Sequence, residues 1–99
     1  MPLQALFLLN SVFVHDQAAR FARSLINERC DIGQRLRLAF MRVYGRPPSA
    51  KEQDRATDYV RNYEQALAAE GTATEHREVE SWSSFARALL ASNEFIYVD

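Results

Sequence analysis

Residues 44–52 read Tyr-Gly-Arg-Pro-Pro-Ser-Ala-Lys-Glu and predict the end of one helix, a stiff connection and the start of another. Gly45 follows an apolar-periodic run, where a helix commonly ends with a residue at positive φ that glycine adopts without strain. Arg46 precedes a proline, which disfavours the α region at that position. Pro47 and Pro48 then hold their own φ angles near the polyproline value.

The start of the second helix is marked by a serine and a glutamate three residues apart. Ser49 and Glu52 have the spacing of a capping box, in which each side chain satisfies a backbone N–H group at the other position. We therefore predict an elbow between two helices. Its structural motif consists of Gly45, Arg46, Pro47, Pro48, Ser49 and Glu52.

Apolar residues at three- and four-residue steps predict four main helices. Their ranges are about 12–29, 32–44, 50–70 and 79–92. The helix at 32–44 is apolar over a wide arc, so we expect it at the centre of the bundle. Residues 72–78 are polar and aperiodic and are predicted to be a loop or a frayed turn. Because the links between the first three helices are short, those helices are expected to be successive antiparallel neighbours.

The same periodicity predicts which side chains are buried. The expected core positions are Val14, Ala18, Phe21, Ala22, Leu25, Ile32, Leu36, Ala39, Phe40, Val43, Tyr44, Ala56, Tyr59, Val60, Tyr63, Leu67, Val79, Trp82, Phe85, Ala86, Leu89 and Leu90. The chain has 99 residues, of which 47% are hydrophobic and 25% charged, as is ordinary for one globular domain. The predicted fold class is an all-α bundle forming a single domain over residues 1–99.

Two apolar segments flank the four predicted helices. Residues 3–9 are expected to form a short leading helix, and Phe95 and Tyr97 in the tail are expected to dock on the bundle. The run Leu6-Phe7-Leu8-Leu9 lacks a basic leader and a cleavage site, so it does not resemble a signal peptide. No apolar stretch approaches the roughly 20 residues of a membrane-spanning helix. We therefore expect a soluble chain.

The net charge is −1, but it is divided unevenly along the chain. Residues 1–49 carry a net charge of +4 and residues 50–99 carry −5, which predicts a basic helix pair packed beside an acidic one. The alternative is polyanion or nucleic-acid binding through the arginines of the predicted helices at 12–29 and 32–44, with Arg35, Arg42 and Arg46 as possible interaction residues. The acidity of the helix that follows the elbow opposes binding to phosphates. We expect Arg46 to cap the carbonyl end of the helix before it, with clamping of a carboxylate as the alternative.

Few residues offer chemistry. A zinc site requires His15, His76 and Cys30 to converge with a carboxylate, and a thiol nucleophile requires Cys30 beside a histidine. Surface histidines and a structural cysteine are the simpler reading. The aromatic residues Trp82, Phe85, Tyr59 and Tyr63 have helical spacing and are predicted to be core. We therefore expect no catalytic residue, no cofactor and no metal.

Three motifs carry a resemblance to a known family. They are Pro-Leu-Gln-Ala-Leu-Phe-Leu-Leu-Asn-Ser at 2–11 with Phe13-Val14 and Gln17-Ala18, Tyr-Gly-Arg-Pro-Pro-Ser at 44–49, and the segment from Trp82 to Asp99. This chain resembles the C-terminal conserved region of large planctomycete proteins of unknown function that often carry a cytochrome-c-like domain. Val12 stands where that family's pattern has proline. The resemblance implies an exported parent protein with a C-terminal helical module, and it supplies no catalytic residues.

The leading function hypothesis is therefore a non-enzymatic helical module. We expect it to pack against other domains of its parent or against a partner protein. The isolated module is expected to expose an apolar face around Leu3 to Leu9, and this face also offers a route to a homo-oligomer.

Overall fold

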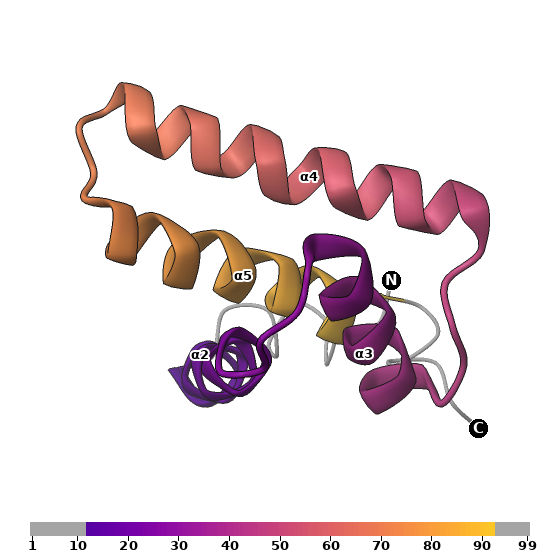
Figure 1. Cartoon of the computed structure of the whole chain (residues 1–99). Coiled ribbons are helices and arrows are strands. Elements are labelled where there is room, and N and C mark those ends of the chain that lie inside the picture. Colours follow the sequence, from indigo (N-terminus) through magenta and orange to yellow (C-terminus); the bar gives the residue numbers. More distant parts are fainter. Residues whose placement is uncertain (1–11, 93–99) are drawn as a thin grey trace.

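The computed structural model describes residues 12–92, which contain four helices and no strand (Figure 1). The helices are α2 (Val12–Ile26), α3 (Ile32–Tyr44), α4 (Ala50–Ala69) and α5 (Thr74–Leu90). The predicted all-α class is confirmed. The predicted leading helix at 3–9 and the predicted docking of the tail lie outside the described residues.

A side-chain cap sets the start of α3, and a glycine follows the end of α4. Asp31 caps α3 through its carboxylate, which accepts from the Gln34 N–H at 2.8 Å, while the Gln34 side chain accepts from the Asp31 N–H at 3.1 Å. This reciprocal pair satisfies two backbone donors. At the far end of α4, Gly71 has φ 85° and the Thr72 N–H donates to the Leu67 carbonyl at 3.0 Å. Glycine suits this position because other residues adopt a left-handed φ only with strain.

The helix α2 ends at Ile26, three residues earlier than predicted. The Glu28 N–H donates to the Leu25 carbonyl, a three-residue step that tightens the last turn and stops the α-helical ladder. The Ile26 carbonyl instead accepts from the Arg35 guanidinium at 3.5 Å. The predicted extension to residue 29 is therefore wrong, because the chain turns here towards α3.

The helix α5 begins at Thr74, so the predicted loop at 72–78 is wrong over most of its length. The side chain of Arg77 holds this first turn together. Its guanidinium donates to the Thr72 carbonyl at 2.7 Å and to the Thr74 hydroxyl at 3.0 Å. Glu75 adds a negative charge in the first turn, where the helix dipole favours it. Polar residues therefore sustain a helix that has no apolar periodicity at its start.

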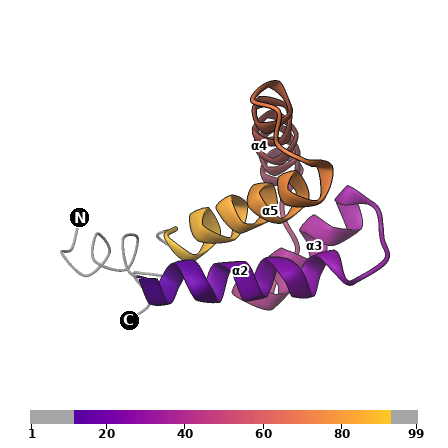
Figure 2. The ribbon, with the colours of Figure 1, turned by 90° about the vertical axis from the view of Figure 1, so that its left-hand side faces the viewer.

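The centre of the bundle is α5 rather than α3. In Figures 1 and 2, α5 lies between α4 on one side and α2 on the other. The main packing partner of α2 is α5, and α4 also packs mainly against α5. Six consecutive residues, from Ser81 to Ala86, are buried, so this part of the helix is covered on every side. The predicted central position of the helix at 32–44 is therefore corrected.

The helices do not form a simple series of antiparallel neighbours. Figure 1 shows α2 nearly end-on where α4 runs across the view, so the two axes cross steeply. The chain reverses direction between α4 and α5, which pack side by side (Figures 1 and 2). In contrast, α2 makes its smaller contact with α3 and its larger one with α5. Short links therefore predicted only part of the neighbour relations.

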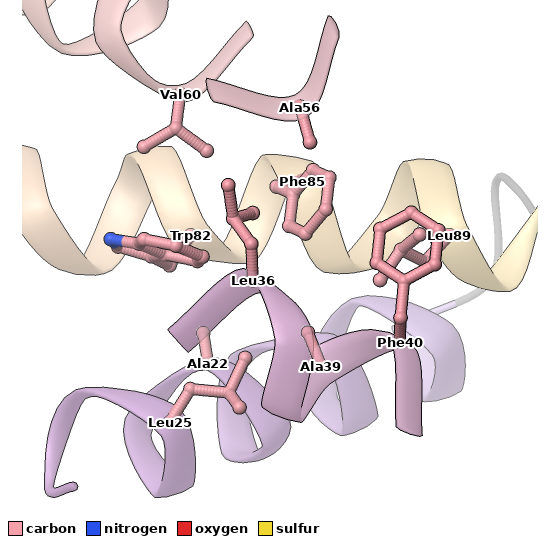
Figure 3. Packing of buried hydrophobic residues seen from close by; sticks show 10 residues of the cluster. All are labelled: Ala22, Leu25, Leu36, Ala39, Phe40, Ala56, Val60, Trp82, Phe85 and Leu89. Atoms are coloured by element: carbon pink, nitrogen blue, oxygen red, sulfur yellow. The ribbon is translucent and has the colours of Figure 1, made fainter. Parts of the chain in front are cut away.

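One apolar cluster joins all four helices (Figure 3). Its buried members are Ala22, Leu25, Leu36, Ala39, Phe40, Ala56, Val60, Trp82, Phe85 and Leu89. The rings of Trp82 and Phe85 meet edge to face with centroids 5.8 Å apart. Arg35 lies over the Trp82 ring at 5.1 Å, which ties α3 to α5. Every member of the cluster is a predicted core position.

Candidate functional site: the elbow and the adjacent groove

The elbow between α3 and α4 has the predicted backbone. Gly45 has φ 72°, and its N–H donates to the Met41 carbonyl at 2.9 Å. Ser49 and Glu52 form the capping box: the Glu52 N–H donates to the Ser49 hydroxyl at 3.2 Å, and the Ser49 N–H donates to the Glu52 carboxylate at 2.8 Å. Both helix ends are therefore closed by groups from the elbow itself.

Arg46 clamps a carboxylate within the elbow. Its guanidinium donates to both carboxylate oxygens of Glu52, at 2.8 and 2.9 Å, and also to the Pro47 carbonyl at 3.1 Å. The same guanidinium lies 5.5 Å from the centroid of the Tyr44 ring and 5.9 Å from that of Phe40. A bidentate pair of this kind fixes orientation as well as charge. The carboxylate clamp, the alternative named for Arg46 in the sequence analysis, is therefore present in the structure.

The clamp changes the acidity of Glu52. Hydrogen bonds from the Arg46 guanidinium, followed by the bond from the Ser49 backbone N–H, lower the pKa of Glu52 from 4.5 to about 2. Glu52 is therefore a carboxylate in the folded protein well below neutral pH. Because the Glu52 carboxylate already accepts two hydrogen bonds from Arg46, it serves the structure of the elbow and is not available as a free acid.

Tyr44 joins the elbow to the end of α5. Its hydroxyl donates to the Leu89 carbonyl at 3.0 Å and also lies 2.6 Å from the Ser92 hydroxyl. Its ring meets that of Phe40 edge to face at 5.4 Å. The last described residue of the chain is therefore held against the end of α3.

Beside the elbow, three helices line an open apolar groove of about 220 Å³. Its walls are formed by Phe40 of α3, Ala56 and Tyr59 of α4, and Phe85 and Ala88 of α5, with Glu52 and Arg55 as the charged lining residues. Figure 3 shows Ala56 and Phe85 facing each other across α4 and α5. A shallow apolar depression with few polar groups suits an apolar side chain better than a polar metabolite.

The exposure of Tyr59 differs from the prediction. Tyr59 is 40% exposed, because its ring lies along the groove. It stacks on Tyr63 at 6.1 Å, and its hydroxyl bonds the Ser84 hydroxyl. The predicted core position of Trp82 and Phe85 is confirmed, whereas that of Tyr59 is wrong. Helical spacing placed Tyr59 near the core but did not show that the space beside it is open.

The other two predicted interaction residues, Arg35 and Arg42, also contact groups of the chain. Arg35 lies over Trp82 and donates to the Ile26 carbonyl. Arg42 donates to the Ser24 hydroxyl at 3.3 Å and to the Glu28 carboxylate at 3.4 Å. The three arginines, with Arg46, therefore connect helices and turns of the fold. Their positions supply no observation in favour of a polyanion site.

The residues that a zinc site or a thiol nucleophile would need, His15, His76 and Cys30, lie in the described part of the chain. Cys30 is half-buried and its thiol bonds the Glu28 carbonyl at 3.6 Å, while His15 and His76 are exposed. Within residues 12–92, no group of three or more histidine, cysteine, aspartate or glutamate side chains is placed to hold a metal ion. None of the helices there has the length and apolar character needed to cross a bilayer.

A comparison with known proteins identifies the family. A model of the family described as PSD1, protein of unknown function (DUF1553), matches residues 1–60. This range includes two of the three motifs noted in the sequence, those at 2–18 and 44–49. No curated protein and no solved structure gave a significant match. Because the match covers more than half of its 99 residues, the chain belongs to the PSD1 family of proteins of unknown function (DUF1553).

Proposed function

We propose that this chain is a non-catalytic helical module that binds another domain of its parent protein or a separate partner protein. The observation that carries the proposal is the start of α2. Val12 and Phe13 are adjacent, large and apolar, and they are 85% and 67% exposed. Two neighbouring hydrophobic side chains on a helix end favour burial against another surface, because contact removes apolar area from water.

The parent protein is the second part of the proposal. The motifs at 2–18 and 44–49 support a parent of the planctomycete type, often carrying a cytochrome-c-like domain and exported from the cytoplasm. Both motifs lie in the part of the chain that matches the family. In such a parent, the module would supply a packing surface and leave any redox chemistry to another domain.

The test uses the full chain and changes the exposed pair. The variant Val12→Ser with Phe13→Ser is compared with the natural chain by sedimentation velocity over a range of concentrations and by binding of an apolar fluorescent dye. We expect the natural chain to bind the dye and to self-associate as concentration rises, because no partner covers the pair. We expect the double variant to lose both properties.

The matched control is Met41→Ser, which removes a half-exposed apolar side chain from α3. This variant is expected to retain dye binding and self-association, because Met41 is a single apolar side chain on α3 and the exposed pair belongs to α2. A natural chain that stays monomeric at every concentration and binds no dye would count against the proposal. Urea unfolding of each variant shows that a lost signal does not come from lost folding.

A further inference from the structure

The groove between α3, α4 and α5 has a defined chemical preference. Its walls come from Phe40, Ala56, Tyr59, Phe85 and Ala88, so it favours a large apolar or aromatic side chain. Of its two charged residues, Glu52 is held by the bidentate contact with Arg46. Arg55 is exposed and forms no ion pair with another residue between 12 and 92. An occupant that carries a carboxylate beside an aromatic ring therefore complements the groove.

The position of Ser92 brings a segment of that chemistry close to the groove. The Ser92 hydroxyl lies 2.6 Å from the Tyr44 hydroxyl, and the Tyr44 ring is 5.4 Å from Phe40, which lines the groove. The chain continues as Asn-Glu-Phe-Ile-Tyr-Val-Asp over residues 93–99, outside the described part. Seven extended residues span up to roughly 25 Å, so the groove is well within reach.

We propose that the groove is the docking site of this chain's own residues 93–99, with an aromatic ring of Phe95 or Tyr97 between α4 and α5. The acidic side chains of the segment, Glu94 and Asp99, supply the charge that faces Arg55. An extended strand alternates its side chains, so in that bound form Phe95 and Tyr97 would share one side and Ile96 would take the other. This contact goes beyond the proposed function, since it requires no partner.

A segment of the same chain has an advantage over a second copy. A short tether gives it an effective concentration in the millimolar range, so it occupies the groove before another molecule at lower concentration does. If the chain also acts as the interaction module proposed above, a partner that uses this groove must first displace residues 93–99.

The test is a nuclear magnetic resonance experiment on the full chain with isotope-labelled alanine methyl groups. We expect nuclear Overhauser contacts from the rings of Phe95 or Tyr97 to the methyl groups of Ala56 and Ala88. The double variant Phe95→Ala with Tyr97→Ala should lose these contacts and shift both methyl resonances. The control Ile96→Ala should retain the contacts, and the methyl group of Ala69, at the exposed far end of α4, should not shift.

Two results would overturn the inference. One is a full chain in which no proton of residues 93–99 contacts the Ala56 or Ala88 methyl group. The other is a set of contacts seen only between differently labelled chains in a mixture, which would assign the groove to a second copy. The near-ultraviolet circular dichroism of buried Trp82 verifies that each variant is folded. Neither result depends on Val12 and Phe13, so failure here is distinct from failure of the proposed function.

Discussion

Replacing Glu52 by glutamine tests how the elbow is stabilised. Glutamine keeps the shape of the side chain and is itself a common residue at this position of a capping box. It removes the negative charge that receives two hydrogen bonds from Arg46. Any loss of stability in Glu52→Gln therefore reports on the carboxylate charge, which receives hydrogen bonds from Arg46 and from the Ser49 N–H, rather than on the shape of the capping side chain.

The magnitude follows from the pKa of Glu52, which is lowered from 4.5 to about 2. A shift of this size corresponds to about 3 kcal/mol of folding free energy if none of it is screened. The Glu52 side chain is 34% exposed, so water and salt screen the pair, and we expect about 1–2 kcal/mol. Because the folded pKa is the lower one, this stability is fully present above pH 4.5. It is lost as the pH falls towards 2.

The assay is urea unfolding followed by the fluorescence of Trp82, which is 3% exposed and reports on the core. At pH 7 the free energy of unfolding of Glu52→Gln should lie about 1–2 kcal/mol below that of the natural chain. The difference should shrink below pH 4.5 and vanish near pH 2. The control Asp58→Asn removes an exposed carboxylate from the middle of α4 and should change stability by less than about 0.5 kcal/mol. A difference that is absent at pH 7, or equally large at pH 2, would refute the reasoning.

Three further substitutions are tested by the same unfolding assay. Leu36→Ala empties a fully buried position and should cost about 2–5 kcal/mol, whereas Met41→Ala on the exposed side of α3 should cost far less; equal costs would contradict the assigned core. Gly45→Ala places a side chain at φ 72° and should cost about 1–2 kcal/mol, although open space surrounds it; no cost would argue against the left-handed cap. Tyr44→Phe removes the hydroxyl that bonds Leu89 and Ser92 and should cost about 0.5–1.5 kcal/mol, and an unchanged midpoint would show that this contact adds nothing.

The local features of the fold were predictable because they depend on neighbouring residues. Glycine, two prolines and the spacing of Ser49 and Glu52 mark the elbow, and the structure contains both the positive φ angle and the capping box. The start of α5 was not predictable in this way. It depends on the Arg77 side chain, which reaches back to Thr72 and Thr74, and such contacts leave no apolar period in the sequence.

The central position of α5 was missed for a related reason. Ser81, Ser83 and Ser84 are buried, although serines in a helical pattern usually indicate a solvent-facing side. The hydroxyl of Ser81 donates to the Arg77 carbonyl at 2.6 Å, and that of Ser84 bonds Tyr59. These bonds satisfy two of the three hydroxyls inside the bundle. Small side chains with internal partners allow other helices to pack on that face.

The groove was not predictable because its residues are far apart in the chain. Phe40, Tyr59 and Phe85 belong to three helices, and each fits the apolar stripe of its own helix. Only the angle between the helices leaves space beside them. Arg46 and Glu52, the two partners of the clamp, lie six residues apart. The sequence allowed a carboxylate partner for Arg46, but only the geometry of the elbow identifies that partner as Glu52.

The position of α5 has a consequence for synthesis on the ribosome. The helix at the centre of the bundle is also the last of the four to be made, so α2 leaves the ribosome long before its main packing partner exists. At about 5–20 residues per second, a few seconds separate residue 60 from residue 90. During that interval the buried face of α2, with Ala22 and Leu25, lacks its larger packing surface, and only the smaller contact with α3 can form. Residues 1–60, which match the family, do not include the helix against which α2 mainly packs, so nascent chains halted there are expected to be substrates for chaperones.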